Sequence, residues 1–129
     1  MDASWVPLAL LASFVLYRWA GGRKARRLLP GLLDRGAVIV DVRTPAEFVA
    51  GANPASVNMP LAELGARLGS LDRARPVVVC CASGTRSALA AAILKRGGFR
   101  EVLDAGPWTN TLRPSAQRQE RRRPDSGRP

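Results

Sequence analysis

The sequence predicts an α/β domain with a mostly parallel central sheet flanked by helices, preceded by one transmembrane helix. Two continuous apolar runs, at 37–42 and 76–80, are typical of strands that are buried on both faces. Each run leads through a short connection into a helical pattern, which is the alternation that builds parallel sheets. A third observation, an uncharged apolar stretch near the N-terminus, predicts the helix that precedes the domain.

The N-terminal stretch resembles a membrane span in composition and in flanking charge. Residues 3–17 carry no charge, and aromatic residues at both ends suit an interfacial belt. A basic run at 18–27 follows, whereas only Asp2 and the amino terminus precede the apolar stretch, so the positive-inside rule places the domain in the cytoplasm. We therefore expect a single-pass anchor at 1–22 and a basic juxtamembrane linker at 23–32. The alternative is the hydrophobic first helix of a soluble domain.

The domain itself is expected at 33–112, with its elements in a simple order. Pro30-Gly31 should break the segment 28–35 into a short helix or turn, and Thr44, Pro45 and Glu47 form the pattern of a capping box that starts a helix. The remaining elements are a loop at 51–59 with a short extended piece, an amphipathic helix at 61–68, a helix at 85–95, a strand at 99–103 and a turn at 105–108. The tail 113–129 is rich in Pro, Arg, Gln and Ser and is expected to be disordered.

Charge and composition exclude several functions. The net charge is +10, but residues 1–27 and 113–129 each carry +4, which leaves only +2 for residues 28–112. With few aromatic residues and no basic stripe in the domain, nucleic-acid binding is not expected. The chain has no histidine, which excludes Cys–His and Ser–His–Asp catalysis. Two adjacent cysteines make neither a disulfide framework nor the usual zinc site, so no metal or organic cofactor is expected.

The segment after the strand at 76–80 is the candidate catalytic loop. Cysteines end the strand, and Ala82 to Ser87 then turn into a helix whose backbone N–H groups point at one spot. A cysteine there should ionise below its usual pKa of roughly 8.5 and become a nucleophile. Arg86 adds a permanent positive charge for an anionic substrate or leaving group.

The choice between the two cysteines depends on the glycine. Counting from Cys81 places Gly84 three positions on and Arg86 five positions on. Counting from Cys80 gives the Cys-x5-Arg spacing of cysteine phosphatases, but puts Ser83 where those enzymes have glycine. The glycine favours Cys81, while the alternative remains that the cysteines are buried strand-end residues without chemistry.

Four blocks of the sequence, in the right order, resemble the rhodanese-like sulfurtransferases. They are Val40 to Phe48 (VDVRTPAEF), Val57 to Pro60 (VNMP), Cys81 to Ser87 (CASGTRS) and Gly98 to Trp108 (GFREVLDAGPW). The resemblance implies a rhodanese-like fold over residues 33–112, with Cys81 and Arg86 as catalytic residues. It also implies that Ala82, Ser83, Gly84, Thr85 and Ser87 bind substrate.

The resemblance further implies supporting roles for Asp41, Arg43 and Trp108. Arg43 is expected to pair with Glu47, and Asp41 to lie near the catalytic loop, although a strand-end carboxylate commonly caps a neighbouring loop. Trp108 is expected either to wall the active pocket or to be ordinary core. Ser87 is expected either to hydrogen-bond into the loop or to be a simple cap.

The activity implied is sulfur transfer through a cysteine persulfide. The donor would be a small sulfur anion such as thiosulfate, and the acceptor a thiol or cyanide. Two alternatives stay open: a phosphatase or arsenate reductase that uses the same anion loop, and a non-catalytic membrane-tethered interaction module.

Overall fold

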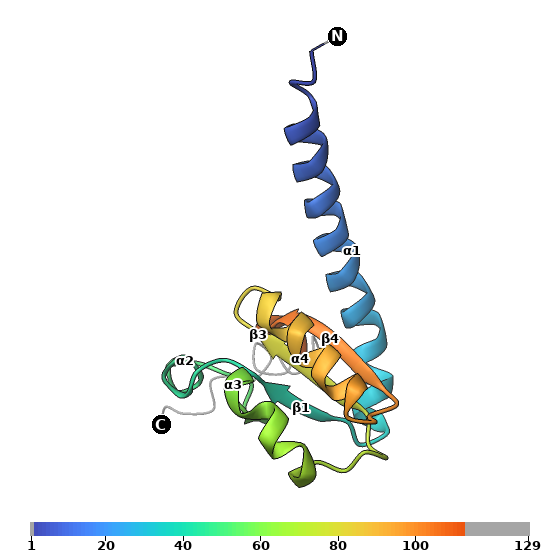
Figure 1. Ribbon diagram of the computed structural model, residues 1–129. Helices are drawn as coiled ribbons and strands as arrows, with labels where there is room; N and C mark the ends of the chain where they lie inside the picture. Colours follow the sequence, from blue (N-terminus) through green and yellow to red (C-terminus); the bar gives the residue numbers. More distant parts are fainter. Residues whose placement is uncertain (1, 113–129) are drawn as a thin grey trace, which may run out of the picture.

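A four-stranded parallel sheet with strand order β2-β1-β3-β4 forms the centre of the computed structural model, which describes residues 2–112 (Figure 1). The expected disorder of 113–129 concerns residues outside the described part. The strands are β1 (Val38–Asp41), β2 (Ser56–Asn58), β3 (Val77–Cys81) and β4 (Val102–Pro107). The helices are α1 (Val6–Asp34), α2 (Pro45–Ala50), α3 (Leu61–Leu64) and α4 (Thr85–Arg96), with 3-10 turns η1 (Gly65–Ser70) and η2 (Trp108–Thr111). The expected α/β architecture with a parallel sheet is confirmed.

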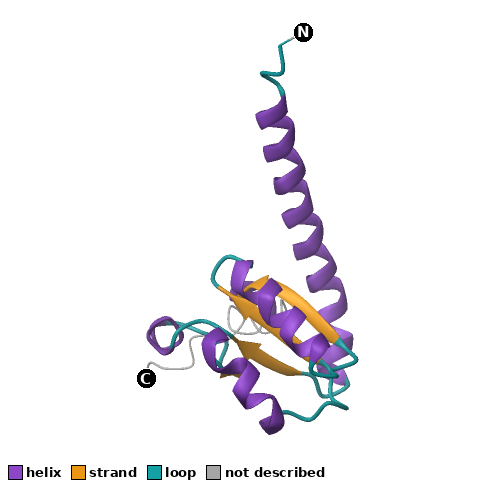
Figure 2. Cartoon of the chain, in the orientation of Figure 1, coloured by secondary structure: helices purple, strands orange, loops and turns teal. Residues whose placement is uncertain are grey.

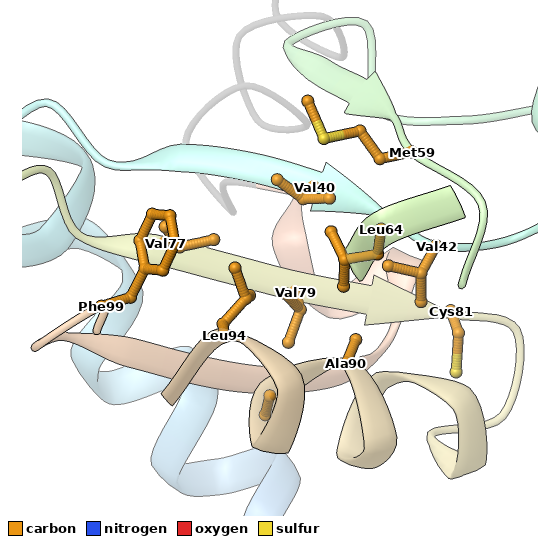
Figure 3. Packing of buried hydrophobic residues seen from close by; sticks show 11 residues of the cluster. Val40, Val42, Met59, Leu64, Val77, Val79, Cys81, Ala90, Leu94 and Phe99 are labelled. Atoms are coloured by element: carbon orange, nitrogen blue, oxygen red, sulfur yellow. The ribbon is translucent and has the colours of Figure 1, made fainter. Parts of the chain in front are cut away.

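Helices cover both faces of the sheet, so the central strand β3 is buried along its whole length (Figure 2). Because side chains alternate along a strand, β3 sends one set of residues to each face. One set joins the α4-face cluster, shown in Figure 3, with helices α3 and α4. The other set joins the α1-face cluster. The α4-face cluster contains Val77, Val79, Cys81, Leu94 and Phe99 among others, and the α1-face cluster contains Ala25, Leu29, Ile39, Val78, Cys80, Leu103 and Ala105.

The capping box at the start of α2 forms as the sequence predicts. The Thr44 hydroxyl accepts the Glu47 amide at 3.3 Å, and the Glu47 carboxylate accepts the Thr44 amide at 3.3 Å. Pro45 occupies the first turn, where its missing N–H costs nothing. This cap fixes where the chain leaves β1, and it holds the Glu47 side chain beside the end of the sheet.

Helix α1 corrects two sequence-based expectations, the linker at 23–32 and the break at Pro30-Gly31. The helix is continuous over 29 residues, with Pro30 inside it. Ala25 and Leu29 are buried against the sheet, with 1% and 2% of their surface exposed, whereas Pro30 is exposed on the outer side. Packing of this inner stripe outweighs the roughly 3 kcal/mol that a proline costs inside a helix. The second half of α1 is therefore a layer of the domain, and the expected boundary at 33 falls inside the helix.

The first half of α1 projects away from the sheet, with large apolar side chains exposed along it (Figure 1). Within residues 2–112, no helix is long and apolar enough to cross a membrane. The physical reason is the length of the uncharged part, which begins at Val6 and ends before Arg18. That part spans about 18 Å, against a hydrocarbon core of about 30 Å. The expected anchor at 1–22 is therefore not found, and the cytoplasmic placement of the domain stays a prediction.

The last strand and the helix after β2 also differ from expectation. β4 begins at Val102 rather than at residue 99, and it continues through Pro107 across the segment expected to be a turn. A shift in register between Val79 and Cys80 accommodates Ala105 and Gly106 as a bulge in β4. The helix expected at 61–68 tightens into η1 at Gly65, because glycine has a low helix propensity.

Candidate active site

Cys81 ends β3 with its side chain on the α4 face, next to the first turn of α4 (Figure 3). Its Sγ accepts a hydrogen bond from the Gly84 amide at 2.9 Å. Cys81 itself is fully buried, whereas Ala82, Ser83 and Thr85 are exposed on the loop above it. The sulfur therefore lies beneath a solvent-exposed turn of backbone that leads into a helix N-terminus, a position where peptide dipoles favour negative charge.

Gly84 shapes this turn through its backbone conformation. It is the N-cap of α4 with φ of +104°, a region that residues with a Cβ rarely adopt. Its carbonyl accepts the Ser87 hydroxyl at 3.0 Å, and Ser87 is buried. The Ser87 hydroxyl thus bonds back into the loop, and the simple cap is not formed, because Gly84 is the N-cap of α4 and no side chain caps this helix.

Cys80 lies on the opposite face of the sheet, in the α1-face cluster. Burial raises the pKa of the Cys80 thiol, and the neighbouring Asp41 carboxylate raises it further. A buried thiol kept protonated in this way is a poor nucleophile. The Cys-x5-Arg spacing counted from Cys80 therefore does not describe a loop of this structure.

Arg86 lies at the start of α4 with its guanidinium bound to Glu47 of α2. Two hydrogen bonds form the pair, from Nη1 to Oε1 at 2.7 Å and from Nη2 to Oε2 at 2.9 Å. The Arg86 guanidinium, helped by the Thr44 amide, lowers the pKa of Glu47 to about 2, and the pair raises the pKa of Arg86. From the sequence, Glu47 was expected to cap α2 and to pair with Arg43, but not to bind Arg86. Nothing local signals it, because the two residues are 39 positions apart.

Asp41 and Arg43 form a buried ion pair at the end of β1. Arg43 donates from Nη2 to Asp41 Oδ2 at 2.7 Å and from Nε to both carboxylate oxygens at 3.0 Å. The Arg43 guanidinium also donates to the Gly51 carbonyl at 2.7 Å, and reaches Glu47 only through its backbone carbonyl, at 3.4 Å. The expected side-chain pair between Arg43 and Glu47 is therefore wrong. Arg43 pairs with Asp41 instead, because the Asp41 carboxylate is buried beside its guanidinium, whereas the Glu47 carboxylate binds Arg86.

Trp108 follows β4 and is half-buried against the α1-face cluster. The Arg43 guanidinium carbon lies 5.1 Å from the centroid of its ring. Cys81 belongs to the cluster on the other side of the sheet. Trp108 thus packs against the α1-face cluster, and its role as a wall of the active pocket stays a prediction.

One residue outside the predicted loop reaches it. Arg18 of α1 donates from Nη2 to the Ser83 carbonyl. From the sequence, Arg18 was expected in the basic run next to a membrane. Its contact with Ser83 could not be predicted, because the two residues are 65 positions apart and meet only in the folded chain.

Comparison with known proteins agrees with this fold. A family model of the rhodanese-like domain matches residues 14–106. The chain belongs to the rhodanese-like domain family. A rhodanese from E. coli, solved with anions, has a similar structure, with a TM-score of 0.57 and 28% identity over 61% of this chain and 95% of that one.

Two curated relatives are sulfurtransferases. A sulfurtransferase of Allochromatium vinosum is 37% identical over 67 residues, which make up 52% of this chain and 63% of that protein. The thiosulfate sulfurtransferase GlpE of Pseudomonas fluorescens is 40% identical over 85 residues, or 63% of this chain and 78% of that protein. The chain thus spans less than two thirds of the Allochromatium protein.

Proposed function

We propose that this rhodanese-like domain is a sulfurtransferase that carries sulfane sulfur on Cys81 as a persulfide. The observation that carries the proposal is the 2.9 Å hydrogen bond from the Gly84 amide to Cys81 Sγ at the start of α4. A backbone donor aimed at a sulfur would stabilise the negative charge that develops there during the reaction. The relatives named as sulfurtransferases support the same chemistry.

In the first half-reaction, the Cys81 thiolate attacks the outer sulfur of a donor such as thiosulfate. A new sulfur–sulfur bond forms to Sγ, the donor's own sulfur–sulfur bond breaks, and its electron pair leaves on sulfite. The terminal persulfide sulfur keeps one negative charge, which the amides of Ala82 to Arg86 would stabilise. Donors of this kind are worth roughly 3 kcal/mol each when they point at developing charge.

In the second half-reaction, an acceptor thiolate or cyanide attacks the outer sulfur of the persulfide. The Sγ–sulfur bond breaks and its electron pair restores the Cys81 thiolate. The product is an acceptor persulfide or thiocyanate, so charge balances in both steps. No proton has to move in either step, which suits a loop that contains no acid or base beside the sulfur.

Mass spectrometry after thiosulfate treatment tests the proposal. We expect the mass of one sulfur atom to be added on Cys81 and removed again by cyanide. Cys81→Ser should abolish the gain, whereas Cys80→Ser, on the other face of the sheet, should keep most of it. If the wild-type protein gains no sulfur, the domain is an interaction module; if it hydrolyses an aryl phosphate instead, the anion loop serves a phosphatase.

A further inference from the structure

Arg18 is the contact of helix α1 with the catalytic loop. Its Nη2 donates to the Ser83 carbonyl, and lies 3.7 Å from the position that a Cβ on Gly84 would take. The guanidinium thus lies next to both Ser83 and Gly84 of the loop. Arginine has five N–H donors, so one bond to Ser83 leaves the others free to bind an anion.

The spacing of residues along α1 explains why Arg18 faces the domain. Ala25 and Leu29 are buried on the sheet, and Gly22, one turn earlier, approaches the Asn110 side chain. Residues spaced by three and four positions share one face of a helix, so Arg18 continues the stripe of Gly22, Ala25 and Leu29. The packing that docks the second half of α1 therefore also aims Arg18 at the loop.

Arg18 also differs from Arg86 in its charge environment. Glu47 neutralises Arg86 through two short hydrogen bonds. Within residues 2–112, Arg18 is not part of the ion pairs that carboxylates form. Its guanidinium carbon lies 5.8 Å from the centroid of the Phe14 ring. The uncompensated positive charge at this loop thus comes from α1 and not from the loop's own arginine.

We propose that Arg18 is the donor-binding residue of this site, which takes the anionic head group of the sulfur donor, a sulfonate or a carboxylate. This inference rests on the proposed function. Arg18 Nη2 lies 3.7 Å from the Cβ position of Gly84, and the Gly84 amide nitrogen lies 2.9 Å from Cys81 Sγ. Together these distances keep the Arg18 guanidinium within about 9 Å of the sulfur. An attack contact of about 3.5 Å, a sulfur–sulfur bond of about 2 Å and a hydrogen bond of about 2.9 Å cover most of that distance. Arg86, held by Glu47, then orients the loop.

A pair of alkylating reagents tests the charge directly. Cys81 Sγ attacks the CH2 carbon of iodoacetate or of iodoacetamide and displaces iodide from either reagent, but only iodoacetate is anionic. We expect Arg18→Met to lower the iodoacetate rate at Cys81 about fivefold and to leave the iodoacetamide rate unchanged, as one unscreened charge at this distance requires. Arg18→Lys should restore part of the iodoacetate rate. The matched control is Arg27→Met, which removes one exposed charge from the same helix away from the loop.

Two results would overturn the inference. If both alkylation rates fall together in Arg18→Met, the residue only supports the loop; if neither changes, its charge does not reach the sulfur. A KM for thiosulfate that rises about fivefold with little change in kcat is the matching result in the transfer assay. The alkylation ratio needs no sulfur transfer, so a protein that gains no sulfur but shows the Arg18 effect would refute the proposed function and leave the anion site standing.

Discussion

Glu47 binds both Thr44 and Arg86, and it therefore couples α2 to the catalytic loop. Its carboxylate completes the capping box with Thr44 and binds both terminal nitrogens of Arg86. The cap fixes the backbone at the end of β1, and the ion pair transmits that position to the start of α4. The guanidinium of Arg86 therefore points where α2 holds it, rather than toward solvent.

The lowered pKa of Glu47 predicts a stability change in acid. The pKa of Glu47 is lowered to about 2 in the folded protein, from a usual value of 4.5. Since the folded-state pKa is depressed, this carboxylate stabilises the fold at pH above about 4.5, and its contribution is lost as the pH falls toward 2. We expect the free energy of unfolding of Glu47→Gln to fall less steeply over this pH range than that of the wild type. Urea denaturation at a series of pH values measures it.

The control for this experiment is Glu63→Gln, whose carboxylate lies 3.6 Å from Arg67 on an exposed helical surface. Exposed pairs of this kind contribute little, so the acid dependence should hardly change. An equal flattening in both variants would show that general charge, and not the pair with Arg86, accounts for the effect.

At the scale of elements, the Asp41–Arg43 pair joins the end of β1 to three other segments. The guanidinium donates to Gly51 after α2 and stacks on Trp108 after β4, while the Asn58 amide of β2 donates to the carbonyls of Asp41 and Arg43. These segments all lie at the carboxyl edge of the sheet, where the catalytic loop also begins. The pair thus holds the edge on which the loop is built.

Removing one partner of this buried pair should be costly. In Asp41→Asn the Arg43 guanidinium would remain buried without its charge partner, which typically costs about 3 to 5 kcal/mol. Chemical denaturation would measure the loss. The comparison variant is Glu101→Gln, which breaks an exposed pair with Arg35 and should cost much less. A loss for Asp41→Asn as small as that for Glu101→Gln would mean that water or a rearranged loop replaces the carboxylate.

At the scale of the whole molecule, local sequence patterns predicted the helices and strands but not the contacts between them. The apolar runs of β1 and β3, the capping box of α2 and the glycines that end α4 all depend on neighbouring residues, and the structure has them as expected. The continuity of α1 through Pro30 could not be predicted, because burial of Leu29 on a sheet formed later in the chain maintains it.

The same limit applies to the site. The strand–loop–helix pattern identified Cys81 and its loop, because a strand end and a helix start are local features. The charges around the loop come from elsewhere: Glu47 from α2 and Arg18 from α1. Sequence spacing contains no information about contacts across 39 or 65 positions, so a basic run next to an apolar helix was interpreted as a membrane flank.

The two cysteines should report separately on the two layers of the fold. Cys80 is covered by α1 and Cys81 by the loop before α4, on opposite faces of one sheet. Leu29 and Ala25 are the buried residues that α1 contributes to its cluster, so α1 can open as a unit before the rest of the domain unfolds. Such opening would expose Cys80 and carry Arg18 away from the loop, while the α4 face stays packed.

Leu29→Ala tests this coupling. Loss of a buried leucine costs about 3 kcal/mol, so we expect iodoacetamide to label Cys80 roughly a hundredfold faster than in the wild type. The preference of Cys81 for iodoacetate should fall at the same time, because Arg18 leaves with the helix. Leu94→Ala removes a leucine of the same size from the opposite face, and should accelerate Cys80 labelling much less at equal global stability. Equal labelling in the two variants would show that the layers unfold together, and that α1 belongs to the cooperative core rather than opening over the active site.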